Sequence, residues 1–401
     1  MESNTILYKP LGDVIELLTD YHANGAYEKL KENVTLLDKE NHAVMIRTTN
    51  FEANDFTNNL IYIDEHAYEF LKKSKVYASD LIMNKIANPG TVYFMPEISK
   101  PVSLGMNLFL IRVNPKKANP YFIYAYLRKN EHYVKSFASG STTKTITKDD
   151  VRRLKIFMPP LQEQNKIAQI LSTWDQAISA TEKMLENSQQ QKKALMQQLL
   201  TGKKRLFDEN GVRFVGEWEK VHIKDCAECL DNKRVPLNSE QRSSMSGTIP
   251  YWGANGIVDY ISDFIFDETI VLLAEDGGYF DEYQTRPISN ISYGKCWVNN
   301  HAHILRAKKN SLNEWIYYCL VHKNILAFVN GGTRAKLNKS DMLMIPLLLP
   351  SLQEQKKIVS VLSLADQEIE NLQKKLDCLK QEKKALMQQL LTGKKRVKVA
   401  A

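Results

Sequence analysis

The stretch KKALMQQLLTGKKR occupies residues 192–205 and returns without a change at 383–396. A second shared stretch lies upstream of each copy, where Leu161-Gln162-Glu163-Gln164 recurs as Leu352-Gln353-Glu354-Gln355. Both pairs are 191 residues apart, so the repeated block has no internal gap, and 28 of its 45 positions are identical. Two copies of one helical element, each preceded by a less similar region, favour a protein with two recognition domains, or heads, over an enzyme with one active-site pocket.

The repeated block has the heptad pattern of a coiled coil. Its seam positions alternate in steps of four and three for about five heptads, from Ile167 to Leu199 and again from Ile358 to Leu390. Each run follows a proline and precedes a glycine, as expected at helix starts and stops: Pro160 and Gly202 in the first copy, Pro350 and Gly393 in the second. The block therefore predicts two helices of roughly 60 Å, at about 1.5 Å per residue.

The seam predicts that the two helices pair with each other. Thr181 and Ser188 in the first copy correspond to Leu372 and Leu379 in the second, and this asymmetry suits a heteropartner pairing within one chain. The first helix delivers the chain to a second domain and the other helix leaves it, so side-by-side pairing must be antiparallel. The alternative is two separate oligomerisation helices that pair with other molecules.

Bulk composition is that of a soluble globular protein of two to four domains, with 401 residues, 43% apolar and 25% charged. Neither a signal peptide nor a bilayer-spanning run stands out, so we expect a cytoplasmic protein. Five cysteines without a signal peptide indicate reduced thiols. Cys226 and Cys229 have zinc-like spacing without a second such pair, so buried thiols are the preferred interpretation and a metal site is the alternative.

The net charge of +8 is unevenly distributed. It is +3 over 1–160, +3 over 161–205, −3 over 206–351 and +5 over 352–401. The repeated blocks and their basic tails therefore carry all of the excess. Binding to DNA by general phosphate attraction would be modest, because that attraction scales with the phosphates neutralised.

The regions between the blocks predict two α/β heads that share an order of elements. The first has a helix after Pro10 (Leu11 to Leu18), strands near 43–47, 91–94 and 107–112, and a helix at 121–127; the second has a helix at 221–230, strands near 269–273 and 302–306, and a helix at 315–321. The predicted fold class is α+β, with two globular α/β domains separated by two long antiparallel coiled-coil helices in an internal pseudo-two-fold repeat. The predicted boundaries are 1–160, 161–205, 206–351 and 352–401.

These residues resemble those of the specificity (S) subunit of Type I restriction–modification enzymes. The resemblance covers essentially the whole chain. It is carried by the two Leu-Gln-Glu-Gln motifs, the two Leu-Leu-Thr-Gly-Lys tails, and three motifs of the second head: Ile249 to Gly256, Ala274 to Gly277, and Asn299 to His303. The first head lacks the Tyr-Trp-Gly-Ala-Asn-Gly and Asn-Asn-His motifs, so its contact residues cannot be carried over.

The resemblance implies two target-recognition domains that read the halves of a split, asymmetric sequence in double-stranded DNA. It also implies two methyltransferase (M) subunits as partners, with restriction (R) subunits joining through that core, and no membrane partner. S-adenosylmethionine, ATP and Mg are expected on the partner subunits. This chain is expected to bind no cofactor or metal and to have no catalytic residue.

The sequence agrees with a non-catalytic role. No phosphate-binding P-loop is present. Asn119-Pro120-Tyr121-Phe122 lacks the second proline of the adenine-methylation motif, and it aligns with Asn313-Glu314-Trp315 in the second head, which favours a structural helix. A self-contained methyltransferase or nuclease is therefore disfavoured. The alternative function is a coiled-coil structural or regulatory protein without DNA specificity.

Base-edge readout needs donors and acceptors on exposed loops. The candidate DNA-binding residues in the first head are Arg47, Thr48, Thr49, Asn50, Lys85, Ser141, Thr142, Thr143 and Lys144. Those in the second are Tyr251, Trp252, Asn255, Asp276, Asn300, His301, Arg334 and Lys336. The alternative for Asn300, His301 and Trp252 is a purely structural role in turns and core.

The polar outer face of the helices is the predicted docking surface for the methyltransferase. Its candidate residues are Gln162, Gln164, Gln197 and Gln198, with their copies Gln353, Gln355, Gln388 and Gln389. The basic tails Lys203-Lys204-Arg205 and Lys394-Lys395-Arg396 could contact phosphates or a partner's acids, or end in solvent.

Overall fold

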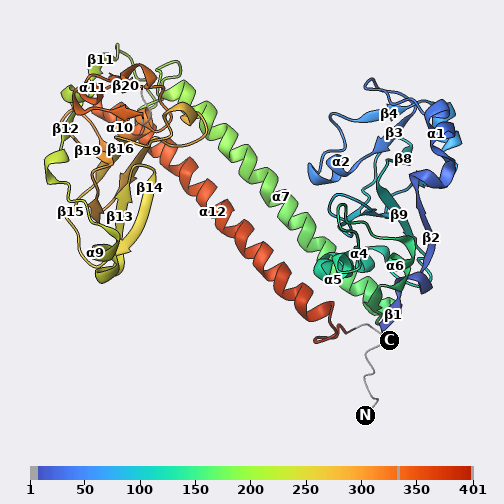
Figure 1. Cartoon of the computed structure of the whole chain (residues 1–401). Helices are drawn as coiled ribbons and strands as arrows, with labels where there is room; N and C mark the ends of the chain where they lie inside the picture. The colour runs from blue at the N-terminus through green and yellow to red at the C-terminus, as the bar shows by residue number, and fades with distance from the viewer. Residues whose placement is uncertain (1–7, 332–334, 399–401) are drawn as a thin grey trace. The chain divides into compact units, whose positions relative to one another are not determined.

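The computed structural model describes residues 8–331 and 335–398, and its chain divides into two compact units (Figure 1). Unit 1 combines Met1–Glu182 with Lys375–Ala401, and unit 2 is Lys183–Lys374. Two 39-residue helices, α7 (Leu161–Leu199) and α12 (Leu352–Leu390), each contribute one segment to each unit. Each unit therefore contains one α/β domain and a segment of both helices.

The domain of unit 1 contains two four-stranded sheets and a two-stranded ribbon. The first sheet has the order β2 (Ile15–Asp20), β9 (Leu108–Val113), β6 (Leu81–Asn84), β7 (Val92–Phe94). The second has the order β4 (Ile61–Ile63), β3 (Ala43–Ile46), β8 (Val102–Leu104), β5 (Lys75–Val76). The ribbon pairs β1 (Tyr8–Pro10) with β10 (Lys155–Phe157).

The helices of this domain are short, except for the aromatic helix α4 (Pro120–Lys129). The others are α1 (Tyr27–Asn33), α2 (Thr48–Glu52), α3 (Glu65–Phe70), α5 (Glu131–Lys135) and α6 (Lys148–Arg153). α4 buries Phe122, Ile123 and Tyr126 in the main core, which also takes in Leu171 of α7 and Leu390 of α12. The long helices are therefore part of the hydrophobic core of the domain.

The domain of unit 2 has the same sheets. They have the orders β12 (Ala227–Cys229), β19 (Ala302–Ala307), β16 (Ile270–Ala274), β17 (Ser289–Ser292), and β14 (Gly256–Ile261), β13 (Ser246–Gly253), β18 (Lys295–Val298), β15 (Phe266–Asp267). Ribbons pair β11 (Glu219–His222) with β22 (Pro346–Leu349), and β20 (Val329–Asn330) with β21 (Lys336–Leu337). The helices are α8 (Ile223–Cys226), α9 (Ser239–Ser244), α10 (Asn313–Leu320) and α11 (Lys339–Leu343).

Strand by strand, the two domains share one topology. In each, a central sheet of four antiparallel strands is accompanied by a second sheet with one parallel pair, β3 with β8 in the first and β13 with β18 in the second. α4 and α10 occupy the same place in the chain, so Asn119 to Phe122 belongs to a structural helix as predicted. The expected internal duplication is confirmed.

Two predicted helices are wrong. Leu11 to Leu18 forms a single 3-10 turn, Leu11–Asp13, followed by β2, which pairs with β9. Val221 to Leu230 is divided among β11, the one-turn α8 and β12. In both cases a short apolar run fits helix and strand alike, and pairing with a strand from elsewhere in the chain decides.

Antiparallel pairing of the long helices is confirmed within each unit. In unit 1, Asp175 of α7 pairs with Lys383 of α12, and Glu182 pairs with Lys380 at 2.8 Å. In unit 2, Ser188 lies 3.3 Å from Glu368, and Lys192 pairs with Asp366. Residue numbers rise on α7 as they fall on α12, and every predicted seam residue is buried or half-buried.

The repeated motifs join the end of one helix to the start of the other. In unit 2, the Arg205 guanidinium donates to both carboxylate oxygens of Glu354, at 2.6 and 2.7 Å. In unit 1, Arg396 donates in the same way to Glu163, with the shortest contact at 2.6 Å. Both glutamates are buried, and a two-pronged arginine–carboxylate pair is the strongest form of such a contact. The arginine that ends each basic tail is therefore an internal clamp, whereas the lysines before it, Lys203, Lys204, Lys394 and Lys395, are exposed.

The glycine after each helix provides a matched test of packing. Gly393 and Gly202 both have φ of +71°, a left-handed conformation that costs a side chain roughly 1 kcal/mol. A Cβ at Gly393 would lie 2.8 Å from Cζ of the buried Phe157, whereas one at Gly202 would meet only Trp218 at 3.6 Å. We expect Gly393→Ala to reduce the free energy of unfolding by about 1–3 kcal/mol more than Gly202→Ala, in urea titrations. Equal losses would show that φ alone sets the cost.

No helix in residues 8–331 and 335–398 has a run apolar and long enough to cross a lipid bilayer.

Candidate nucleic-acid interface

Four segments of the second domain meet at the ends of its strands, and we call them loop cluster 2: residues 253–256, 275–278, 299–301 and Lys336. Main-chain hydrogen bonds join them. Asn299 N donates to Trp252 O (3.0 Å), Glu275 N to His301 O (2.9 Å), and Leu337 N to Glu275 O (2.7 Å). The Asn255 side chain adds a fourth link, donating to Gly277 O at 2.8 Å. Segments far apart in sequence therefore form one rigid surface.

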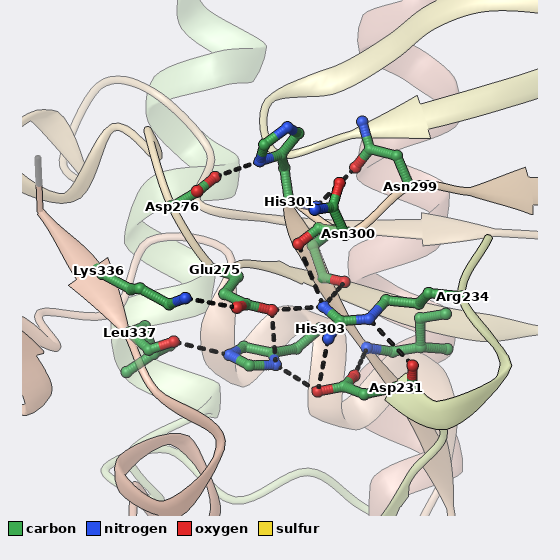
Figure 2. A network of polar contacts seen from close by, with 12 residues as sticks. Asp231, Arg234, Glu275, Asp276, Asn299, Asn300, His301, His303, Lys336 and Leu337 are labelled. Carbon is green, nitrogen blue, oxygen red and sulfur yellow. Dashed lines mark hydrogen bonds and ion pairs between the residues drawn. The ribbon is translucent and has the colours of Figure 1, made fainter. Parts of the chain in front are cut away.

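The outer side chains of loop cluster 2 are polar and accessible. Asn255, Asn300 and Lys336 are exposed, while His301 and Asp276 are half-buried and joined through Nδ1 and Oδ1 at 2.5 Å (Figure 2). Amide, imidazole, carboxylate and ammonium groups together offer both donors and acceptors to base edges and phosphates. The structure thus brings together five of the predicted residues of this head.

Beneath this surface lies a network formed by Asp231, Arg234, Glu275 and His303 (Figure 2). His303 is 1% exposed; its Nδ1 lies 2.7 Å from Asp231 and its Nε2 lies 2.8 Å from Leu337 O. Arg234 pairs with Glu275 and donates to Ala302 O at 3.0 Å. The network ties the start of β19 to the segment after β16, so it holds two loops of the surface in place.

The sequence motifs of this head are divided between the network and the surface above it. Glu275 and His303 lie in the network, whereas Asp276 and His301 belong to the surface above it. Burial raises the pKa of Asp231, but hydrogen bonds from His303 and Ile304 and the charge of Arg234 outweigh it, so the net pKa lies below the usual value.

Asp231, Glu275 and His303 also form a group whose ligand atoms lie within 4.8 Å of one another, as in a metal site. Arg234 pairs with both acids, and Lys336 reaches Glu275 at 3.2 Å. The carboxylates therefore already have cationic partners, and we assign the group a structural role.

Cys226 and Cys229 lie apart from this group, on α8 and β12. Cys226 is buried, Cys229 is half-buried, and burial raises the pKa of each thiol to about 11. The thiols are therefore protonated near neutral pH and fit the buried-thiol interpretation.

Tyr251 does not lie on the surface, contrary to expectation. It is 2% exposed, its hydroxyl accepts from Leu237 N at 2.9 Å, and its ring packs with Ile261 and Trp297. Trp252 is half-buried against a hydrophobic cluster and donates to Ser292 Oγ at 3.1 Å, which fits the structural alternative. Arg334 lies outside the described residues.

The first domain has an equivalent surface, which we call loop cluster 1: residues 47–49, 85–90, 105–107 and 139–146. The same main-chain bonds build it. Gly105 N donates to Ile46 O (2.9 Å), Lys85 N to Asn107 O (2.9 Å), and Ile146 N to Lys85 O (3.2 Å). These bonds match those of loop cluster 2 one for one.

The matching bonds identify equivalent residues that sequence alignment missed. Ile46 corresponds to Trp252, Lys85 to Glu275, and Gly105-Met106-Asn107 to Asn299-Asn300-His301. The first head therefore does have counterparts of both missing motifs. The offsets are 206, 190 and 194 residues rather than 191, so insertions conceal them in the sequence. Met106 and Asn107 were not among the predicted residues.

Several predicted residues of the first head lie in loop cluster 1. Thr49 and Ser141 to Lys144 are exposed, and Arg47 and Thr48 are half-buried. Arg47 Nε is buried without a hydrogen-bond partner among the described residues, although its Nη2 donates to Asn59 O at 3.3 Å. The Nε–H is thus a buried donor without an acceptor within the described residues.

Two other predicted residues of this head have internal partners. Lys85 forms an ion pair with Asp20 at 3.2 Å, and Lys148 lies 3.0 Å from the same carboxylate. Burial raises the pKa of Asp20, but the two lysines outweigh it, and the net pKa is lowered. The prediction that Asn50 contacts DNA is wrong. Asn50 is 5% exposed and caps α2 by accepting from Arg47 N at 3.0 Å.

A hollow of about 440 Å³ lies beside the exposed loop of cluster 1. Its lining combines two lysines with two threonine hydroxyls and small residues: Ala87, Asn88, Pro89, Lys135, Ala138, Thr142, Thr143 and Lys144. Such a lining suits an anionic phosphate group.

The helix residues predicted to face a partner divide into two groups. Gln162, Gln197, Gln198, Gln353, Gln388 and Gln389 are exposed. Gln164 and Gln355 are wrong, because they are 1% and 0% exposed. Gln164 Oε1 accepts from Asn119 N (3.0 Å) and Gln355 Oε1 accepts from Leu312 N (3.1 Å), so each ties a long helix to the start of α4 or α10.

Comparison with known proteins adds three findings. The family described as "Type I restriction modification DNA specificity domain" matches residues 8–188 and 216–381. The putative Type I restriction enzyme MjaX specificity subunit of Methanocaldococcus jannaschii is 27% identical over 84% of this chain and 83% of its own. The putative specificity subunit S.HindORF215P of Haemophilus influenzae is 36% identical over 147 residues, which is 36% of either chain.

A solved structure has the same fold. The S subunit of a Type I restriction–modification system from M. genitalium superposes with a TM-score of 0.65 over 98% of both chains, at 17% identity.

Proposed function

This chain belongs to the Type I restriction–modification specificity family, and from that premise we propose that it selects the DNA target for a complex whose other subunits do the chemistry. Its two domains would read two different half-sites of one split sequence. The observation that carries the proposal is the pair of loop clusters. They share a backbone framework, but their side chains differ at equivalent positions, as in Lys85 against Glu275 and Met106 against Asn300.

The side chains of loop cluster 2 would supply the second half-site contacts. Asn255 and Asn300 carry amides that can donate and accept, and an asparagine amide matches the N6 and N7 edge of adenine. Asp276 can accept from a cytosine amino group directly, or it can orient His301 for that contact. In cluster 1, Arg47, Thr48, Thr49 and Lys144 are the corresponding donors, and the hollow beside Lys144 would take a backbone phosphate.

The stretches that are identical in the two helical blocks, 192–205 and 383–396, would dock two copies of one methyltransferase subunit. Lys193, Ala194, Gln197 and Gln198 are exposed, and so are their copies Lys384, Ala385, Gln388 and Gln389. Exposed side chains contribute little to folding, so packing does not require the two surfaces to be identical. Binding the same partner twice does.

In this proposal the chain is not itself an enzyme. S-adenosylmethionine would bind the methyltransferase subunits, and ATP and Mg would bind restriction subunits that join through them. What this chain supplies is position, because loop contacts fix where the bound subunits meet the DNA.

Mapping N6-methyladenine in cells that express the chain with its methyltransferase tests the proposal. We expect one motif with two specified halves and an unspecified spacer, detected by single-molecule sequencing. Exchanging residues 206–351 for the corresponding domain of another family member should change one half only. A motif that changes in both halves, or methylation without any motif, would refute the assignment.

A further inference from the structure

In the first domain the methionine Met106 stands where the second domain has Asn300. The strand pairing that matches Ile46 with Leu104 is the counterpart of the pairing that matches Trp252 with Val298. The following residue in each chain segment, Gly105 or Asn299, donates its N–H back to the neighbouring strand. The correspondence of the next residue therefore follows from backbone geometry alone.

Met106 is displayed on a loop whose backbone is clamped on both sides. A Cβ at Gly105 would lie 2.5 Å from Ile46 O, so the loop lies directly against the end of β3. On the other side, Asn107 O accepts from Lys85 N at 2.9 Å, and Asn107 has φ of +64°. The Met106 backbone is thus held in place between two fixed neighbours.

The Met106 side chain does not serve packing. It is 52% exposed, whereas Met45, Met83 and Met95 of the same domain are each 3% exposed or less. Its neighbours across the loop cluster are polar, with Arg47 beside Gly105 and Lys85 beside Asn107. The Met106 thioether is therefore an apolar group among cationic side chains, and it can make an apolar contact in a DNA groove.

We propose that Met106 is a specificity-determining residue that contacts the 5-methyl group of a thymine in the half-site read by the first domain. The inference rests on the proposed function. The thymine methyl is the one apolar group on the major-groove edges of the bases, and an apolar side chain selects it. The long, unbranched thioether adapts to such a group, and the clamped loop limits the entropy lost on contact.

Deoxyuridine provides the test, because it differs from thymidine only by that methyl group. Once the methylated motif is known, each thymine in it is replaced singly by deoxyuridine, and duplex affinity is measured for the complex of this chain with its methyltransferase. One replacement should weaken binding by the wild-type complex about three- to fivefold, the effect of burying one methyl group. Met106→Ala should bind the thymine and uracil duplexes equally, and Met106→Leu should restore the preference.

Met184→Ala is the matched control, because Met184 is 50% exposed but lies on α7 outside the loop clusters, and it should discriminate as the wild type does. The proposal is overturned if no replacement affects wild-type binding, or if Met106→Ala keeps the full preference. The proposal is also overturned if Met106→Ala weakens binding to the thymine and uracil duplexes by the same factor, because the side chain would then contact the DNA without recognising the methyl group. Absence of any preferred duplex for the wild type would be a failure of the proposed function itself.

Discussion

The double variant Gln197→Glu, Gln388→Glu is expected to lose co-purification with the methyltransferase while the chain itself stays folded. The two glutamines are exposed at equivalent positions of the stretches that are identical in both blocks. A carboxylate buried in an interface without a partner costs roughly 3 kcal/mol, which weakens each site about 100-fold. Each single variant should retain one methyltransferase, so native mass spectrometry should find complexes with two, one and no partner across the series.

The chain contains its own control for the added charge. Gln191 corresponds to Glu382 in the second copy, and both are exposed. Gln191→Glu adds the same charge to the same helix at a position where one copy already carries it, so co-purification should be unaffected. Full retention of both partners by the double variant, with unchanged circular dichroism, would refute the docking surface.

Arg234→Ala is expected to destabilise the second domain by about 3–5 kcal/mol, the usual cost of removing one partner of a buried ion pair. The variant would leave Glu275 and Asp231, which are 13% and 7% exposed at their side chains, without this cation. It would also free the carbonyl of Ala302. Urea denaturation measures the loss. Sequence discrimination in the second half-site should fall with it, because the loops above the network lose their support.

Arg306→Ala is the matched control in the same domain, on β19. Arg306 pairs with Glu228 and Glu268 but is 37% exposed, so its loss should cost less than about 1 kcal/mol. Equal losses in the free energy of unfolding for Arg234→Ala and Arg306→Ala would refute a special role of the network.

Acid provides a second measurement of the same network. The pKa of Asp231 is lowered in the folded protein, so its ionised form contributes stability above the usual aspartate range, near pH 4. That contribution is lost as pH falls through the lowered pKa. The stability difference between wild type and Asp231→Asn should therefore be largest near neutral pH and narrow in acid.

The long helices could be predicted from sequence because their pattern is long and locally consistent. About five heptads of seam residues leave little room for another structure, and each predicted seam position is buried or half-buried. Leu11 to Leu18 is too short for periodicity to decide, and its strand depends on β9, almost a hundred residues away.

The site was only partly predictable for a different reason. Polar residue types usually mark a surface, but Gln164 and Gln355 are buried because backbone groups of other segments satisfy their amides. Conversely, Met106 is of a residue type that is usually buried in the core, but it is exposed. Equivalence between the loop clusters depends on hydrogen bonds across insertions, which no fixed offset in the sequence could reveal.

The clamps between Arg205 and Glu354 and between Arg396 and Glu163 have a consequence for inheritance. Because the motifs that form the two clamps are the same in both blocks, either arginine would fit either acid. A recombination event within the blocks would therefore join the front half of one gene to the back half of another and keep both clamps. Under the proposed function, such a protein would acquire a new combination of half-sites in a single crossover. The target sequence would then change, while the helix residues that dock the methyltransferase would stay the same.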